Sequence, residues 1–433
     1  MERTSTGLNR LSKIALIVIA LWSLVRASTQ SVTPGEAWNY DRHIGPHWEE
    51  SLKQFDPNNH VLNTILVKIS TARIHLTEFS LRLPSLLFGV LYLIAAYRIS
   101  RRWFGQGRMF LAVLGLLTLN PLILDAMSEA RGYGMSLACW MWALDLVTAG
   151  GSMNAAGVLI GLSVAGSLAF LAPAVALIAA CIGRRKLEYM PHLSFLVAFL
   201  VLLLPLNHAE RDLITSGATS LRQTLNELTA ASLDTGNRIV AAIIRVAMGV
   251  LAAIAVIVLL ARKIELRLIA GALVGSLLLV KLANWKAGSA FPEGGAIYLI
   301  PIVTLLVALL VREWGREKIE IAFVVIAAMG CAHYADHLSL PYRGEGELAG
   351  GRDVAKALRA DVKNRGVRVG VSAAAEPILR YYKWRYRQAN WEPIEKVGGE
   401  RFDYYVLTTA DAGLIQQRGL KVLYRDAGLL LAK

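Results

Sequence analysis

Charged side chains are scarce in this chain of 433 residues. They make up 18% of the sequence against 55% hydrophobic residues, whereas a soluble domain carries about 25% charged residues. Cysteine is also rare, and Cys139, Cys181 and Cys331 all lie inside apolar runs without the spacing of a metal site or of a disulfide framework. These absences exclude a soluble multidomain protein, a disulfide-stabilised secreted domain and a cysteine metal centre.

Long apolar runs take the place of the missing polar surface. A helix needs about 20 apolar residues to cross a bilayer, and the sequence offers such runs repeatedly. We therefore predict an all-α polytopic membrane protein, with residues 1–340 as its membrane module. Eleven spans are expected, at residues 14–25, 79–97, 109–124, 135–149, 155–166, 168–182, 193–206, 239–261, 266–282, 297–311 and 319–335. Residues 155–182 could instead form one long helix, but the basic loops favour a hairpin that turns near Gly166 and Ser167.

The net charge of +14 comes largely from short loops between the apolar runs. Membrane topology and anionic lipid headgroups therefore explain it better than nucleic acid does. Sixteen Lys and Arg residues fall in about 50 loop positions on one side, and eight fall in about 100 positions on the other. The denser side is predicted to be the cytoplasm, as in an inner-membrane protein. The N-terminus then lies there as an uncleaved first helix, and the odd number of spans places the C-terminus in the periplasm.

The polar remainder, residues 341–433, is expected to form a small soluble α/β domain. Its pattern predicts helices and strands in alternation. The predicted helices are 353–364, 375–387 and 413–418, and the predicted strands are 367–371, 402–408, 421–423 and 428–432. No glycine-rich nucleotide fingerprint is present. Residues 381–387, with the sequence YYKWRYR, suit either a face that rests on lipid headgroups or a solvated helix face.

Three polar segments fall on the predicted outer side of the membrane. The first is the loop 27–77 between the first two spans, with a helical apolar pattern after residue 60, and the others are 128–133 and 207–212. They are expected to share one cavity at the outer membrane boundary. Carboxylates beside arginines at a lipid interface suit transfer from a lipid-phosphate donor to a hydroxyl or amine, because a carboxylate removes the acceptor proton and cations hold the departing phosphate.

Four short sequences in this region resemble those of a known enzyme class. They are TPGEA at 33–37, PNNHVL at 57–62, LTEFSLRLPSL at 76–86 and EARGY at 129–133. Together they resemble the polyprenyl-phosphate-sugar-dependent GT-C glycosyltransferases, the relatives of protein mannosyltransferases and lipid A aminoarabinose transferases. The resemblance covers residues 33–133 well, the later spans only in layout, and the tail hardly at all.

The resemblance implies catalytic and binding roles for particular residues. Glu36 aligns with the loop acid that such enzymes use as a catalytic base, and Asp41 is the second candidate because Gly35 stands where relatives often have Asp. Some relatives bind a divalent cation near this loop, but the metal ligands are unknown here. Lys286 is the candidate replacement for an arginine that relatives have before Tyr298. The candidate substrate-binding residues are Asn59, His60, Arg82, Glu129, Arg131, Tyr133, His208 and Lys286.

Each of these residues also has a plain structural interpretation. Glu36 could be a solvated loop carboxylate, and Glu129 with Arg131 could be an interfacial pair that caps two helix ends. Arg82 lies one turn inside the second span and could extend its side chain to the outer headgroups. Asp145 has no partner near it in sequence, and its place near the cytoplasmic end indicates a structural role.

The sequence thus predicts a membrane glycosyltransferase. It would move a sugar from a polyprenyl-phosphate donor to an acceptor glycan, lipid or protein on the outer face, with inversion and with a carboxylate base. The alternatives are a lipid or polysaccharide transporter or flippase without such chemistry, and a catalytically silent GT-C relative. Charged or broken helices at mid-bilayer would favour the transporter, whereas the polar residues here gather at one face.

Overall fold

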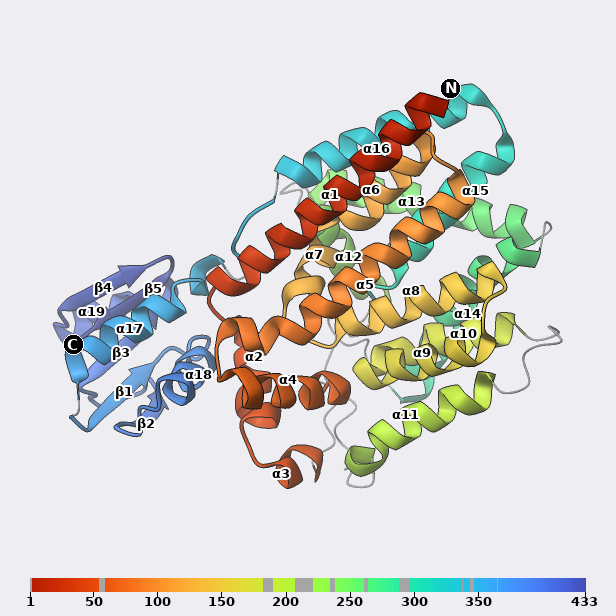
Figure 1. Cartoon of the computed structure of the whole chain (residues 1–433). Coiled ribbons are helices and arrows are strands. Elements are labelled where there is room, and N and C mark those ends of the chain that lie inside the picture. Colours follow the sequence, from red (N-terminus) through yellow and green to blue (C-terminus); the bar gives the residue numbers. More distant parts are fainter. Residues whose placement is uncertain are drawn as a thin grey trace.

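A bundle of helices followed by a small α/β domain forms the whole chain in the computed structural model (Figure 1). The structure describes residues 2–53, 59–181, 190–206, 221–233, 238–260, 264–287, 296–336, 338–342, 346–363 and 365–433. The helices of the membrane module are α1 (Glu2–Thr29), α2 (Pro34–Asn39), η1 (Tyr40–Ile44), α3 (Trp48–Lys53), α4 (Val61–Ile74), α5 (Glu78–Phe104), α6 (Arg108–Thr118), α7 (Pro121–Ser128), α8 (Tyr133–Ala149), α9 (Met153–Gly166), η2 (Leu168–Phe170), α10 (Leu171–Ala180), α11 (Met190–Leu206), α12 (Leu221–Leu233), α13 (Arg238–Leu260), α14 (Ile264–Ala287), α15 (Leu299–Trp314) and α16 (Glu317–Asp336).

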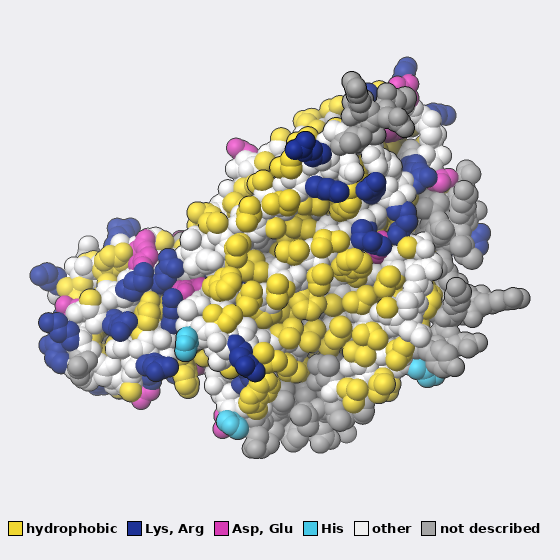
Figure 2. All heavy atoms as spheres, in the orientation of Figure 1, with side chains coloured by type: hydrophobic (Ala, Val, Ile, Leu, Met, Phe, Trp, Pro, Cys, Tyr) yellow, Lys and Arg dark blue, Asp and Glu magenta, His cyan; other side chains and the backbone are white. Residues whose placement is uncertain are grey.

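Every predicted span falls on a helix of this bundle. Among the described residues, α1, α5, the apolar part of α13 and α16 are long and apolar enough to cross a membrane, and the kinked pair α6 and α7 adds a fifth if the two helices count as one span. The count of eleven spans stays a prediction. A broad apolar face covers the middle of the module, whereas the charged side chains gather towards its edge and on the small domain (Figure 2).

The third predicted span is wrong as a single straight helix. Helix α6 ends at Thr118, and α7 starts at Pro121 with a bend of 56° between the two. Asn120 caps α7 by accepting from two backbone amides, and Pro121 suits the first turn because it needs no amide partner there. The bend carries the chain to Glu129, at the end of the bundle that is predicted to face outwards and that we call the outer end.

The chain also breaks where the hairpin was predicted. Helix α9 ends at Gly166, and Ser167 has an extended backbone before η2 begins, so residues 155–182 are not one long helix. Gly132 lies against this break. It is so close that an added Cβ would come within 1.9 Å of the Gly166 carbonyl oxygen. Only glycine permits that backbone contact. The contact sets the 129–133 loop against the end of α9.

The C-terminal domain is built on one mixed five-stranded sheet, in the order β2-β1-β3-β5-β4. Strand β1 pairs in parallel with β2 and β3, and β5 pairs antiparallel with β3 and β4. Its elements are η4 (Gly346–Leu348), α17 (Gly351–Val362), β1 (Val367–Val371), α18 (Glu376–Tyr386), β2 (Trp391–Lys396), β3 (Tyr404–Thr408), η5 (Thr409–Asp411), α19 (Gly413–Arg418), β4 (Val422–Asp426) and β5 (Leu429–Ala432). The predicted helices and strands are confirmed to within a few residues. Strand β2 was missed, because Pro393 weakens its strand pattern and is tolerated there since β2 lies at the sheet edge.

This domain docks on the first loop, residues 27–77. Helix α18 packs against α2 and η1, and one apolar cluster runs from Val32, Ala37 and Tyr40 of the loop to the core of the domain. Tyr381 and Tyr382 are fully buried in that cluster. The prediction that residues 381–387 form a lipid-facing or solvated face is therefore wrong for these two rings, although the Trp384 side chain stays half exposed.

The two ends of the bundle differ in what they carry. The first loop and the C-terminal domain lie together at one end, and the N-terminus lies at the other (Figure 1). Near the N-terminus, the Tyr97 hydroxyl donates to the Asn9 side chain, which joins the end of α5 to the start of α1. The N-terminus and the C-terminal domain thus lie at opposite ends of the bundle, as expected if they lie on opposite sides of a membrane. Which side faces the cytoplasm stays a prediction.

Candidate functional site

Glu36 is held at the start of α2 by the local sequence. In the segment Thr33-Pro34-Gly35-Glu36, the Thr33 hydroxyl accepts from the Glu36 amide at 3.1 Å, and the Thr33 amide donates to Glu36 Oε2 at 2.9 Å. This reciprocal capping box fixes both the helix start and the direction of the Glu36 side chain. The carboxylate therefore points into the protein, where it is 1% exposed.

Arg82 of α5 meets this carboxylate with two parallel hydrogen bonds. Its Nε donates to Glu36 Oε1 at 2.8 Å, and its terminal nitrogen donates to Oε2 at 2.6 Å. The remaining guanidinium hydrogens go to the backbone carbonyls of Ala27, Gln30 and Ser31. The expectation that Arg82 extends to the outer headgroups is wrong, because its side chain is fully buried and ties the end of α1 to the first loop.

The loop after α7 provides a further partner for Glu36, and these residues with Arg82 form what we call the outer cluster. The Ala130 amide donates to Glu36 Oε1 at 2.6 Å, and Asn63 of α4 donates to the Ala130 carbonyl at 3.1 Å. Each Glu36 oxygen thus accepts two hydrogen bonds, which fills the roughly four lone-pair sites of a carboxylate. No site on Glu36 is left for a substrate hydroxyl in this arrangement.

Glu129 and Arg131 flank Ala130 and are more open. The Glu129 side chain is 16% exposed and that of Arg131 is 33% exposed, with 3.8 Å between Glu129 Oε1 and the guanidinium. The Thr33 hydroxyl donates to Glu129 Oε1 at 2.9 Å. Burial raises the pKa of the Glu129 carboxyl above its ordinary value; Glu36 and Asp125 add to this, whereas Arg131 and the Thr33 bond oppose it.

Gly35 lies directly against Arg131. A Cβ at Gly35 would come within 3.4 Å of the Arg131 guanidinium, an ordinary contact distance. Arg131 also lies over the Tyr133 ring, with 5.3 Å between its central carbon and the ring centre. A side chain at position 35 would therefore lie against this guanidinium, and glycine has none.

His60 and Tyr133 meet beside the same loop. Their rings pack edge to face with 4.7 Å between centres, and both are buried. Gly132 lies close to this pair, because a Cβ added there would come within 2.7 Å of the His60 Cβ. Asn59 is buried too, but its amide donates to the Ser51 carbonyl and its oxygen accepts from Thr64, so its described bonds fix the loop itself.

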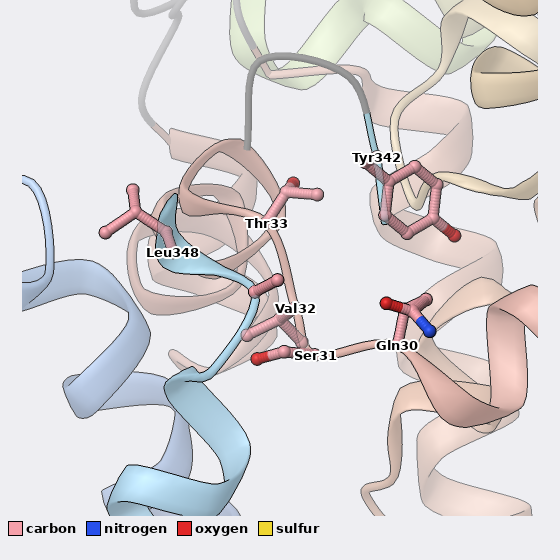
Figure 3. A pocket seen from close by; sticks show the side chains of 7 residues that line it. Gln30, Ser31, Val32, Thr33, Tyr342 and Leu348 are labelled. Atoms are coloured by element: carbon pink, nitrogen blue, oxygen red, sulfur yellow. The ribbon is translucent and has the colours of Figure 1, made fainter. Parts of the chain in front are cut away.

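Tyr342 closes the cluster on the side of the C-terminal domain. Its hydroxyl donates to the Ser128 carbonyl at 3.2 Å, and its ring lies 4.1 Å from the Arg26 guanidinium and 4.7 Å from that of Arg82. Burial raises the pKa of Tyr342 to about 12, so the ring stays neutral between the two cations. A small pocket beside it has room for about one water molecule. Its lining is Gln30, Ser31, Val32, Thr33, Tyr342, Leu348 and Ala349 (Figure 3).

The structure thus brings together five of the predicted residues: Glu36, Arg82, Glu129, Arg131 and Tyr133, with His60 alongside. Asp41 instead accepts a hydrogen bond from Trp384 of α18 at 3.2 Å. His208 lies outside the described residues, and Lys286 falls in α14 with its side chain outside them. In the described part of the chain no three His, Cys, Asp or Glu side chains gather in a way that could hold a metal ion, and the divalent cation stays a prediction.

Sequence reasoning missed three members of the cluster. Thr33 had a signal, since T-x-x-E is the sequence of a capping box. Asn63 and Tyr342 had none, because each reaches the site through a backbone carbonyl that is distant in the chain. The partner of Asp145 was also missed: Arg98 and Arg102 of α5 bind it at 2.8 and 2.6 Å.

The fold defined by these helices, with the docked α/β domain, is that of the GT-C glycosyltransferases. The aminoarabinose transferase ArnT from Cupriavidus metallidurans in the apo state has a similar structure, with a TM-score of 0.61 and 14% identity over 99% of this chain and 98% of that one. ArnT bound to undecaprenyl phosphate gives a TM-score of 0.59, with the same identity and coverage. No family model matches the sequence, and no curated protein matches it.

A more distant likeness is to the oligosaccharyltransferase of Archaeoglobus fulgidus tethered to an acceptor peptide. It has a TM-score of 0.43 and 12% identity over 89% of this chain and 63% of that one. That score is too low to support an inference about the site.

Proposed function

We propose that this protein is an integral membrane glycosyltransferase that moves a sugar from a polyprenyl-phosphate donor to an acceptor on the outer face. One observation carries the proposal. Segments that are distant in sequence, 33–36 of the first loop, Arg82 of α5 and 129–131 after α7, converge at one end of a GT-C bundle. The cluster leaves one carboxylate and one guanidinium partly exposed beside each other.

The donor class is inferred from the fold and from Arg131. The similar ArnT structure contains undecaprenyl phosphate. Here, the Arg131 side chain is one-third exposed, and we propose it as the contact to the lipid phosphate, since a guanidinium binds phosphate oxygens strongly. Lys286, the candidate replacement for the late arginine, is proposed as a second phosphate contact. The acceptor is a glycan, a lipid or a protein.

Glu129 is our preferred general base. Its carboxylate would take the proton of the acceptor hydroxyl or amine, the acceptor atom would form a bond to the anomeric carbon, and the phosphate would leave with the electron pair of the broken bond. This single displacement inverts the anomeric centre. A phosphate leaves readily, so no general acid is needed. Burial raises the pKa of Glu129, which makes its carboxylate a better proton acceptor.

Glu36, the base predicted from the resemblance, is better suited to positioning. All its hydrogen-bond sites are occupied, by Arg82, Thr33 and the Ala130 amide. It would hold Ala130, and hence Glu129 and Arg131, in place. Asp41 would act only indirectly, through its bond to the C-terminal domain.

Transfer from a panel of radiolabelled undecaprenyl-phosphate sugars by the purified protein in nanodiscs tests this proposal, together with binding of undecaprenyl phosphate. Glu129→Gln should lower the transfer rate by about 10² to 10⁴-fold and leave binding of undecaprenyl phosphate intact. Glu320→Gln, an exposed acid at the first turn of α16, is the matched control and should behave as wild type. Full transfer by Glu129→Gln would remove Glu129 from the mechanism. Lipid transport without transfer would favour the flippase. If the protein does not bind undecaprenyl phosphate and does not transfer sugar, the proposal is rejected.

A further inference from the structure

One tyrosine of the C-terminal domain reaches into the start of the first outer loop. Tyr382 of α18 is fully buried, and its hydroxyl donates to Glu78 Oε1 at 3.0 Å. Since that proton is used, the hydroxyl accepts from the Ser31 hydroxyl at 3.0 Å and from the Val32 amide at 3.3 Å. A phenol has one donor and two acceptor positions, so this hydroxyl is fully bonded.

The segment that Tyr382 holds is the one that builds the candidate site. The Ser31 carbonyl accepts from Arg82 at 2.7 Å. Thr33, one residue after Val32, caps Glu36 and donates to Glu129. A shift of residues 31–33 would therefore move the partners of Glu36, Arg82 and Glu129 at the same time.

Glu78 anchors the other side of the same contact. It is the first residue of α5, whose start is fixed by a capping box between Thr77 and Ser80. Besides accepting from Tyr382, its carboxylate pairs with Arg385, one turn further along α18. The C-terminal domain is thus tied both to the loop and to the helix that carries Arg82.

Two neighbouring tyrosines of α18 provide a contrast. Tyr381 is also fully buried, and Tyr386 stacks on Tyr382 with 5.6 Å between ring centres. Among the described residues, neither of their hydroxyls has a hydrogen-bond partner. These rings contribute apolar packing, whereas the hydroxyl of Tyr382 alone of the three joins the domain to the loop.

We propose that Tyr382 is a positioning residue of the transferase, and that the C-terminal domain is part of its catalytic unit rather than an appended module. The hydroxyl fixes residues 31–33, and through Thr33 it fixes the hydrogen bonds of Glu129. This inference rests on the proposed function for its effect on transfer. Its effect on the order of the loop is independent of that function.

Hydrogen–deuterium exchange of the full-length protein tests the loop directly. Tyr382→Phe keeps the ring but leaves Glu78, Ser31 and Val32 without their shared partner. Peptides covering residues 27–41 should exchange about three- to tenfold faster than in wild type. Tyr381→Phe and Tyr386→Phe make the same change on the same helix and should leave these peptides unchanged. Equal exchange in Tyr382→Phe and Tyr381→Phe would overturn the proposal.

The pH profile of transfer then separates positioning from a general loss of folded protein. The groups around Glu129 are Arg131, Glu36, Asp125 and Thr33, and the Thr33 bond favours the ionised carboxylate. If Tyr382→Phe releases Thr33, the acid limb of the profile moves to higher pH, as it should in Thr33→Val. The double variant should show no further shift, because both changes act on one bond.

A loss of folded protein would lower the rate at every pH without moving the limb. An unmoved limb in Tyr382→Phe, with a moved limb in Thr33→Val, would contradict the positioning role. If wild type transfers no sugar at all, the proposed function fails, while the exchange contrast still decides whether Tyr382 orders the loop.

Discussion

Each end of α5 carries arginine bound to a buried acid, and the two ends differ in how far the arginines are shielded. At the outer end, Glu36 and Arg82 are both fully shielded, and every hydrogen-bonding group of the pair has a protein partner. At the other end, Asp145 is buried, but its partners Arg98 and Arg102 are 48% and 29% exposed. The outer pair joins irregular segments, whereas the other joins two helices.

This difference shows how irregular backbone is held at the end of a bundle. The carbonyls of Ala27, Gln30 and Ser31 are not used by helix hydrogen bonds, and Arg82 satisfies all three. The pair is therefore a scaffold for the loop that carries Thr33 and faces Glu129. Arg98 and Arg102 hold one carboxylate between them, so either can be lost with less consequence.

The largest effect should come from breaking the outer pair. Arg82→Leu leaves Glu36 as an uncompensated buried charge, which costs about 3–5 kcal/mol of stability. Thermal unfolding of the detergent-purified protein measures this. Arg98→Leu is the matched control, because Asp145 keeps Arg102 and the change should cost about 1 kcal/mol or less. Similar losses of stability in both variants would contradict the distinction between the two ends of α5.

The pH dependence of transfer should follow Glu129. Its pKa is raised, chiefly by burial, and a base works only when deprotonated, so kcat/KM should rise with pH through a pKa above the ordinary carboxyl value. Below that pKa the rate should fall about tenfold per pH unit. The limb should vanish in Glu129→Gln. A limb that persists in Glu129→Gln would assign it to another group.

A smaller effect is expected from the flank of Arg131 that faces Gly35. Gly35→Asp places a carboxylate against that guanidinium, so undecaprenyl phosphate should bind about fivefold more weakly, since the new pair competes with the phosphate. Gly35→Ala should bind as wild type, because its Cβ makes an ordinary contact. Increased transfer in Gly35→Asp would instead indicate that this chain is a weakened relative that lacks an acid at position 35.

The smallest effect belongs to the other end of α5. Asp145→Asn removes the charge between two partly exposed arginines that water can solvate. Thermal stability should fall by about 1 kcal/mol or less, and transfer should not change. A loss of transfer without a loss of stability would mean that this end communicates with the outer site.

Local patterns predicted most of the fold. The apolar runs gave a helix at each expected span, and strand β1 and helix α19 have the predicted bounds, because burial and hydrophobic period are properties of short segments. Strand β2 failed because Pro393 obscures an edge strand. The kink between α6 and α7 was missed although Asn120-Pro121 is a helix-start signal.

The site was predictable only in part, for a different reason. Glu36, Arg82, Glu129 and Arg131 were singled out by motif, but the sequence did not show which of them would be sealed and which left open. That depends on contacts between distant segments, such as the Ala130 amide on Glu36. The docking of Tyr382 was likewise hidden, because aromatic and cationic residues in one segment suit a lipid surface as well as a protein interface.

The central claim is that the outer cluster is where the donor phosphate binds. A cryo-electron microscopy structure of the protein in nanodiscs with undecaprenyl phosphate tests it most directly. We expect the phosphate within hydrogen-bonding distance of Arg131, beside Glu129, with the Glu36–Arg82 pair intact behind them. A phosphate bound elsewhere, with Glu129 and Arg131 facing no ligand, would contradict it.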